Sequence, residues 1–471
     1  MKKFNKDSYL KKLKLKRNWQ RFSKYFCVGI PCVLCLVLGI YFAYSKFFVS
    51  KEQSVVRTTV GDFIYGDVVI NAYIDGEYSS TIPGKNDGYV VDKVSCDNGA
   101  VGKWNNDKWG LLTTNLTKRT KCNVYFKKVV SKVSDIIAQL DTTGKCPTMN
   151  ADGSVNVTGV EATNGYLCKA KDAYGDSYYY RGNVTNNYVK FADKYWRIVR
   201  INGDGTVRVI YDGTSAHANG ESSRDRQIGT SVFNSSYNDN AYVGYMYGKI
   251  GASTYADAHA NTNDSTIKTY IDNWYKTNIV GTTNEQYLAD NVFCNGRSIS
   301  SNKPTSNYNN LGYGTNVTAY RWYYGPWESG GYNYSMRLMC PQKNDAFTVS
   351  DITNGNGALT YPVGLLSADE IVLAGGWPVA NSGYYLYSGQ YWWASSPFDF
   401  NGNYARVRSI GSSGYANYSD YVNSNNGVRP VLNLKAEAIK YGDGTASNPY
   451  RLTESLDNSS SNESGGIDTG D

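Results

Sequence analysis

The chain has 471 residues, of which 41% are hydrophobic and 19% charged, enough apolar sequence for two or three domain cores. Its net charge of +7 is concentrated at one end. The first 24 residues contain ten Lys or Arg and one acid, which leaves 38 basic and 40 acidic residues, about −2, for the remainder. A nucleic-acid-binding domain carries its positive charge on the folded surface, so this distribution argues against nucleic acid as a partner.

The N-terminal sequence predicts a membrane anchor. Residues 1–25 would form a basic cytoplasmic segment, and 26–45 a transmembrane helix, because eighteen residues from Phe26 to Ala43 carry no charge. Ten Lys or Arg precede this stretch and only Lys46 and Lys51 follow it closely, so the positive-inside rule predicts a single-pass protein of the cell membrane with a cytoplasmic N-terminus and extracellular C-terminal domains. A cleaved signal peptide is the alternative, because the apolar stretch ends in a small-x-small sequence.

The nine cysteines divide into two groups. Three lie in the apolar stretch and are expected as small membrane residues or acylation sites. The other six predict disulfides, as in exported proteins. Sequential pairing joins Cys96 to Cys122, Cys146 to Cys168 and Cys294 to Cys340, although six cysteines allow about fifteen pairings. The sequence has no Cys/His cluster with metal-ligand spacing, so no metal or other cofactor is expected.

Four further segments follow the apolar stretch. Short β-branched and aromatic runs at 49–127 predict a small all-β, sandwich-like spacer module, packed on Trp104 and Trp109. An amphipathic pattern at 128–145 predicts a linker helix. Residues 146–452 form a larger domain. The tail, 453–471, contains five acids and no base and is expected to be disordered.

The larger domain is expected to be α+β, with a small central sheet and long loops rich in Gly, Asn, Ser and Tyr. Asn202–Gly205 predicts a hairpin turn between two alternating runs. Apolar spacing predicts a helix at 265–279. Ser367 and Glu370 form a capping box at the start of a second helix.

No established catalytic motif occurs in the sequence. The two histidines, His217 and His259, have no metal-ligand spacing and are expected to be ordinary loop residues. An enzyme would need a cluster of titratable groups in one pocket. The candidates for such a cluster are Asp369, Glu370, Arg406 and Asp420. The protein is therefore expected not to be an enzyme.

Tyrosine is the most unusual feature of the composition. The chain contains 43 tyrosines, eight of them between Tyr384 and Tyr421. Buried tyrosines need partners for their hydroxyls, so this many are not all expected in a core. Tyrosine mixed with Ser, Gly and Asn is typical of adaptable binding surfaces, because the ring supplies rigid contact area and the small polar residues adjust around it.

A family resemblance rests on the same region. The sequence YWWASSP, followed by a Gly/Asn/Tyr-rich segment and then GVRPVLNL, resembles a bacterial and phage domain of unknown function with a C-type-lectin-like fold, related to formylglycine-generating enzymes. The resemblance covers most of Tyr178–Leu434. It is also similar to the variable proteins of diversity-generating retroelements, in which a diversified stretch before the closing strand forms the ligand-binding face. The calcium-binding tripeptides of sugar-binding lectins and the cysteine pair of formylglycine-generating enzymes are absent.

The resemblance implies a division of the region into framework and display. Tyr391–Trp393 and Val428–Leu434 would be framework, with Trp392 and Trp393 in the core and Arg429 a structural arginine. The residues expected to contact the ligand are Phe398, Asp399, Asn401, Asn403, Tyr404, Arg406, Arg408, Tyr415, Asn417, Tyr418, Asp420, Tyr421, Asn423 and Asn425. Tyr404, Tyr415, Tyr418 and Tyr421 are expected to contribute most.

The sequence thus predicts a membrane-anchored, surface-displayed protein that binds a protein or glycan ligand outside the cell, through a Tyr/Asn-rich face that a retroelement diversifies. One alternative is an exported enzyme that acts on cell-envelope or glycan substrates. The other is a structural surface protein whose tyrosines pack loop against loop.

Overall fold

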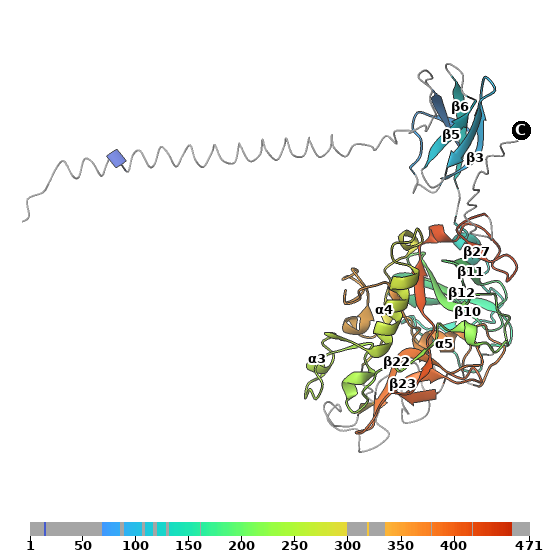
Figure 1. Cartoon of the computed structure of the whole chain (residues 1–471). Coiled ribbons are helices and arrows are strands. Elements are labelled where there is room, and N and C mark those ends of the chain that lie inside the picture. Colours follow the sequence, from blue (N-terminus) through green and yellow to red (C-terminus); the bar gives the residue numbers. More distant parts are fainter. Residues whose placement is uncertain are drawn as a thin grey trace, which may run out of the picture. The chain divides into compact units, whose positions relative to one another are not determined.

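The computed structural model describes residues 14–15, 68–84, 89–105, 109–115, 120–128, 131–160, 162–298, 318–319, 335–377, 379–416 and 418–454. The chain divides into two compact units, Met1–Lys128 and Val129–Asp471 (Figure 1). The expected transmembrane helix at 26–45 lies outside the described residues, as do the basic segment 1–25 apart from two residues and most of the tail.

No helix among the described ranges is long and apolar enough to cross a membrane. A membrane-spanning helix needs about 20 predominantly apolar residues. The long helix α4, Thr266–Asn278, has 13 residues and alternates polar with apolar side chains. The described residues therefore do not support the prediction of a single-pass protein of the cell membrane, and the span 26–45 on which that prediction depended lies outside them.

The first unit is built from β-strands. Its four-stranded sheet has the order β2-β1-β6-β3, with β1 parallel to β6 and the other neighbours antiparallel. A separate hairpin pairs β4 with β5. Asp75 and Gly76 both have positive φ, as the tight turn between β1 and β2 requires. The strands are β1 Val69–Ile74, β2 Glu77–Ser79, β3 Tyr89–Cys96, β4 Val101–Asn105, β5 Gly110–Thr114 and β6 Lys121–Lys128.

The core of this unit lies around the two predicted tryptophans. The Trp104 ring meets Trp109 edge-on at 5.4 Å and Phe126 at 5.2 Å. Trp104 is 9% exposed and Phe126 is 1% exposed. The predicted packing of the module on Trp104 and Trp109 is confirmed.

The second unit contains an eight-stranded sheet with the order β21-β26-β13-β12-β10-β9, in which β11 pairs with β12 and with β27. The hairpin predicted at Asn202–Gly205 is confirmed, because β12 and β13 pair antiparallel on either side of it. The strands are β9 Tyr166–Asp172, β10 Gly175–Arg181, β11 Tyr188–Phe191, β12 Lys194–Ile201, β13 Val207–Gly213, β21 Val363–Gly364, β26 Val431–Leu434 and β27 Tyr450–Arg451.

A six-stranded sheet carries the Tyr/Asn-rich segment, with the order β14-β25-β22-β23-β24 and with β18 paired to β22. Its strands are β14 Thr230–Ser231, β18 Thr318–Ala319, β22 Trp392–Phe400, β23 Ala405–Ile410, β24 Tyr418–Tyr421 and β25 Asn426–Gly427. Short strands elsewhere are β7 Thr148–Met149, β8 Val155–Asn156, β15 Met246–Tyr247, β16 Asn263–Asp264, β17 Phe293–Cys294, β19 Ser335–Met336 and β20 Ala346–Phe347.

The α-helices described in this unit have from four to 13 residues. They are α2 Val133–Ile137, α3 Tyr255–Ala258, α4 Thr266–Asn278 and α5 Ala368–Ala374. Ser265 caps α4 through a hydrogen bond to the backbone N–H of Lys268. The predicted capping box of Ser367 and Glu370 is confirmed at the start of α5.

The linker predicted at 128–145 differs from the observed segment. Its helix α2 has five residues, and Val133 and Ile136 are buried in the core of the second unit. The Lys132 backbone N–H also bonds the Ile439 carbonyl at 2.7 Å. The amphipathic pattern therefore reflects packing within one unit, and the helix belongs to that unit.

The predicted fold class, a C-type-lectin-like α+β domain after a transmembrane helix and an all-β module, is corrected: the protein is mostly β-sheet. The helix signals at 265–279 and at Ser367 were right, but the long loops between them contain paired strands. Several, such as β17, β19 and β20, have two residues each. A strand so short shows no alternation in sequence, because its pairing is decided by the neighbouring strand.

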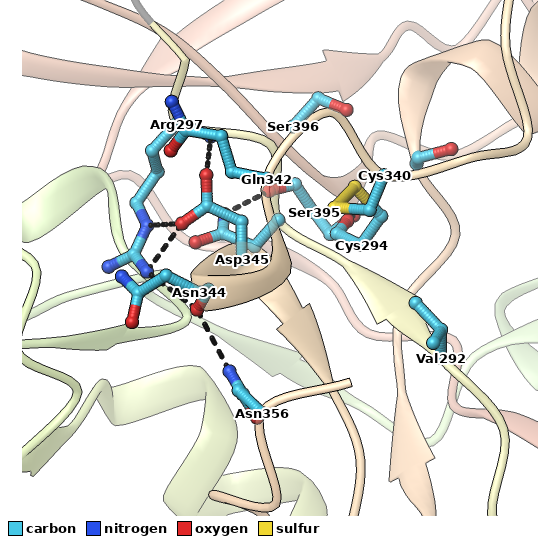
Figure 2. The surroundings of a disulfide bond; sticks show 12 residues. Val292, Cys294, Arg297, Cys340, Gln342, Asn344, Asp345, Asn356, Ser395 and Ser396 are labelled. Carbon is cyan, nitrogen blue, oxygen red and sulfur yellow. Dashed lines mark hydrogen bonds and ion pairs between the residues drawn. A yellow bond between two sulfur atoms is a disulfide. The ribbon is translucent and has the colours of Figure 1, made fainter. Parts of the chain in front are cut away.

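All three predicted disulfides are present: Cys96–Cys122, Cys146–Cys168 and Cys294–Cys340. The third lies beside the ion pair of Arg297 and Asp345, both fully buried (Figure 2). The Ser395 hydroxyl donates to the carbonyl of Cys294 at 2.6 Å. These bonds connect the loop region around the disulfide to β22.

Candidate binding surface

Three exposed tyrosines lie together at the turn between β22 and β23. The Tyr404 ring stacks on Tyr237 at 5.2 Å and meets Tyr421 at 4.7 Å. Tyr237 is 37% exposed, Tyr404 38% and Tyr421 44%. We call these three residues the tyrosine surface. Each ring is held by ring contacts and still offers solvent-accessible area.

The local backbone explains the position of Tyr404. The Asn401 side-chain oxygen accepts the backbone N–H groups of Asn403 and Tyr404 at 3.0 and 2.8 Å, which closes an Asx-type turn. Gly402 supplies the positive φ in this turn, +94°. The N–H of Ala405 then donates to the Tyr237 carbonyl at 2.7 Å. The turn and this bond hold the first two rings side by side.

Two arginines beside the surface cover an aromatic ring. The Arg406 guanidinium lies 4.7 Å from the Phe398 ring centre and that of Arg408 lies 4.0 Å from it. Arg406 also forms a bidentate pair with Asp399, at 2.7 and 2.6 Å. Burial raises the pKa of Asp399, although Arg406 opposes this effect. This group is fixed by its own contacts, so it supports the strand pair.

Asp420 joins two strands at the edge of the same sheet. Its carboxylate accepts the Ser409 hydroxyl at 2.7 Å and the Asn426 amide at 2.8 Å. Tyr415 is half-buried and packs against the core. Both residues are therefore engaged with the protein more than with solvent.

The fourteen predicted contact residues thus separate by exposure. Exposed side chains are those of Asn403, Tyr404, Tyr421, Asn423 and Asn425, and half-buried ones those of Phe398, Asn401, Arg406, Tyr415 and Asp420. Asp399 and Arg408 are 3% and 2% exposed, so the expectation of display fails for these two. Asn417 and the side chain of Tyr418 lie outside the described part of the chain.

The predicted framework is buried except at Tyr391, which is 43% exposed. Trp392 and Trp393 are 1% and 0% exposed. The guanidinium of Arg429 is fully buried and donates to the carbonyls of Tyr211 and Leu386 and to the Asp212 carboxylate. The tyrosine surface is therefore anchored to a densely packed interior.

The residues proposed for a catalytic cluster have separate partners. Glu370 is buried between Arg208 and Arg200, at 2.7 and 3.2 Å. Burial would raise the pKa of Glu370, but the two arginines lower it to about 2. Asp369 accepts the backbone N–H of Arg337, and burial raises its pKa to about 7. Arg406 and Asp420 are engaged with the partners described above. The hydrogen bonds and ion pairs described for these four side chains therefore lead to four different sets of partners.

One titratable group escaped the sequence reasoning. His217 lies between two carboxylates, with Nδ1 2.7 Å from Glu221 and Nε2 2.9 Å from Asp225. His217, Glu221 and Asp225 are spaced four residues apart in the sequence, and this spacing could have indicated that the three side chains lie close together. His259 instead meets the Tyr255 ring edge-on at 4.0 Å, and burial lowers its pKa to about 2. Among the residues that the structure describes, no group of His, Cys, Asp or Glu is arranged to hold a metal ion.

The tyrosine surface also has a member that lies outside the predicted segment. Tyr237 comes from a loop more than 150 residues earlier in the chain, and Tyr404 brings it to the surface by stacking. Only the tertiary fold brings the two together, so sequence alone gave no signal for it.

Comparison with protein families, with curated proteins and with solved structures finds no match for this chain. The resemblance to variable proteins of diversity-generating retroelements therefore stays a prediction.

Proposed function

We propose that the second unit is a binding module that recognises a protein or glycan ligand through the tyrosine surface and the exposed asparagines around it. The observation that carries the proposal is the contiguous contact of Tyr237, Tyr404 and Tyr421, each more than a third exposed. Single exposed aromatic residues are common on any protein surface. A contiguous cluster of exposed aromatic rings is less common and marks an interaction site.

The physical basis of binding is rigid aromatic contact area. Tyrosine loses few rotamers when it binds, and here the ring contacts have already fixed the side chains. Asn403, Asn423 and Asn425 are exposed and supply amide donors and acceptors around the rings. Preorganised aromatic anchors within a polar rim are the usual composition of an interface centre.

The enzyme alternative depended on a shared pocket for Asp369, Glu370, Arg406 and Asp420, and their separate partners give it no support. The alternative of a structural surface protein makes a different prediction. If the tyrosines serve only to pack loops, their removal should lower the unfolding temperature and leave no binding to lose.

The experiment is a screen of the full chain on protein and glycan arrays, followed by the triple variant Tyr237→Ala/Tyr404→Ala/Tyr421→Ala. We expect the triple variant to lose at least 100-fold in affinity, because each aromatic anchor contributes about 2 kcal/mol. Its unfolding temperature should change by only a few degrees, because all three side chains are partly exposed. Tyr78→Ala is the matched control, since Tyr78 is a 66% exposed tyrosine of the first unit and also has a ring partner. Unchanged affinity in the triple variant would refute the proposal.

The proposal extends to diversification of the segment 391–434, as the resemblance implies. Exposed positions such as Asn403 and Asn423 tolerate replacement, because the residues that hold the sheet together are the buried ones. The flanking DNA tests this part. A near-copy of the coding segment that differs only at adenines, next to a reverse-transcriptase gene, is the expected finding, and its absence from the complete flanking sequence would contradict it.

A further inference from the structure

The second unit contains a polar pocket that the tyrosine surface does not use. Its volume is about 240 Å³. Three segments line it: the chain after α2, the start of β9, and the end of β10 with the loop that follows. The lining side chains that matter here are Gln139, Tyr166, Tyr180, Asn183, Thr185 and Asn186.

The walls of this pocket are held by backbone contacts and a disulfide. The N–H of Asp141 donates to the Leu167 carbonyl at 2.9 Å, and the Cys146–Cys168 disulfide joins the same two segments. At Gly165 the two walls approach so closely that a Cβ would lie 2.6 Å from the Asn183 carbonyl oxygen. The Gln139 side chain accepts the Asn186 amide at 2.8 Å across the pocket. The pocket is therefore formed before any ligand arrives, which reduces the ordering cost of binding.

Tyr180 contributes to the pocket lining a buried hydroxyl that has no partner among the described residues. Its residue is 2% exposed, and its hydroxyl has no hydrogen-bond partner in the part of the chain that the structure describes. Burial raises its pKa, so the hydroxyl stays protonated and available as a donor. Tyr450 bonds the Gln139 side chain in the pocket wall. A buried hydroxyl without a partner costs about 1–3 kcal/mol, which a ligand oxygen would recover.

The charge of the lining limits the ligand. Asp141 is the charged side chain among the lining residues, and its oxygens already accept the N–H groups of Thr143, Lys145 and Cys146. Because no lysine or arginine lines the pocket, an anion would find no counter-charge. An apolar ligand would leave the amides and hydroxyls of the lining without hydrogen-bond partners, which costs free energy. A neutral ligand rich in hydroxyl groups satisfies these donors and acceptors.

The size of the pocket limits the ligand further. Sites for drug-sized molecules have volumes of about 300–1,000 Å³. A volume of about 240 Å³ therefore suits a smaller ligand, of the size of one sugar ring. Tyr166 is half-buried and presents part of an aromatic ring, the kind of apolar surface that a sugar's C–H groups pack against.

We propose that this pocket binds one neutral monosaccharide unit, independently of the tyrosine surface, with the Tyr180 hydroxyl as a buried donor to a sugar oxygen. Free monosaccharides and the terminal residue of a neutral oligosaccharide share this chemistry. Parallel titrations of the full chain with the free neutral sugars glucose, galactose, mannose and N-acetylglucosamine, and with neutral oligosaccharides that end in them, distinguish the two sources.

The decisive variant is Tyr180→Phe, which removes the hydroxyl and keeps the ring. Its matched control is Tyr179→Phe, because the Tyr179 hydroxyl is equally buried and without a described partner but does not line the pocket. Neither variant loses a hydrogen bond within the protein, so both should keep the thermal transition of the parent chain. We expect Tyr180→Phe to weaken sugar binding about 10-fold and Tyr179→Phe to leave it unchanged.

Thr185→Val is a second test, because it removes a hydroxyl from the rim of the pocket at nearly constant volume. Tyr404→Ala should leave sugar affinity intact, so loss of the tyrosine-surface ligand and loss of the sugar are separable. Failure of every free sugar and every oligosaccharide to bind the parent chain would overturn the proposal. So would sugar binding that Tyr180→Phe and Thr185→Val both leave unchanged, or that Tyr404→Ala abolishes.

Discussion

Tyrosines occupy two opposite environments in the second unit. Tyr384 and Tyr385 are 0% exposed, and their hydroxyls have no hydrogen-bond partner within the described ranges. Tyr404 and Tyr421, which belong to the same C-terminal region, are more than a third exposed and contact each other. The same residue type therefore fills a core at one place and forms a surface at another. The difference lies in the packing around each ring, which composition does not encode.

The comparison also corrects an argument from composition. The abundance of tyrosine favoured a surface role, because a buried hydroxyl was expected to need a partner. Several tyrosines are nevertheless buried without one, Tyr179 and Tyr180 among them. Burial of the ring outweighs the cost of the unpaired hydroxyl when the apolar area is large.

The largest expected effect comes from the buried ion cluster around Asp212, which lies on β13 of the eight-stranded sheet. Asp212 is fully buried and contacts Arg226 at 2.7 Å, Arg429 at 2.8 Å and Arg197 at 3.8 Å. Asp212→Ala would leave three buried cations uncompensated and should lower the free energy of unfolding by about 3–5 kcal/mol, measured by urea denaturation. Asp420→Ala is the control and should cost about 1 kcal/mol, because its partners Ser409 and Asn426 are neutral and Asp420 itself is half-buried. Equal costs would mean that the cluster does not stabilise the framework.

A substitution of the same kind in both environments tests the comparison directly. Tyr384→Ala should lower the free energy of unfolding by about 3–5 kcal/mol, because it leaves a cavity in the core. Tyr404→Ala should cost less than about 1 kcal/mol, because its ring is partly solvated. Tyr384→Phe is the control for the hydroxyl and should be nearly neutral, since that hydroxyl has no described partner. Denaturant titration of the three variants measures all of these effects.

Acid should weaken the framework through Glu370. Burial raises the pKa of this carboxyl, but Arg208 and Arg200 lower it from 4.5 to about 2. A lowered pKa stabilises the folded state above pH 4.5, and this stabilisation is lost as the pH falls toward 2. The loss should reach about 3 kcal/mol of unfolding free energy. In Glu370→Gln the decline between pH 5 and 2 should be shallower by that amount, and an identical pH profile in both proteins would contradict the assignment.

Local signals in the sequence were sufficient for some elements. Ser367 and Glu370 are three residues apart and identify a helix start, and alternation on both sides of Asn202–Gly205 identifies a hairpin. Sequential cysteine pairing was right for all three disulfides, because each closes a short loop. These features depend on neighbours within a few tens of residues.

Features that depend on distant partners were missed or misplaced. Tyr237 joins the tyrosine surface only by stacking on Tyr404, and the polar pocket combines Gln139 with Tyr180 from a separate strand. Asp399 was also expected on display, although its partner Arg406 is only seven residues away and their bidentate pair keeps it buried. Side-chain exposure at the edge of a sheet is decided by tertiary contacts, so the sequence indicated the segment but not its exposed members.

The smallest expected effect is the coupling between the exposed rings. A double-mutant cycle of Tyr404→Ala and Tyr421→Ala should give a coupling energy of about 0.5 kcal/mol in unfolding free energy, because the rings touch at 4.7 Å and solvent reaches both. Tyr404→Ala combined with Ile352→Ala, at a 69% exposed residue outside the tyrosine surface, should give none. The same cycle measured on ligand affinity should show a larger coupling, because a ligand that spans both rings excludes water from the contact. If the coupling energy measured on affinity is no larger than the one measured on stability, the two rings stabilise each other and do not contact a common ligand.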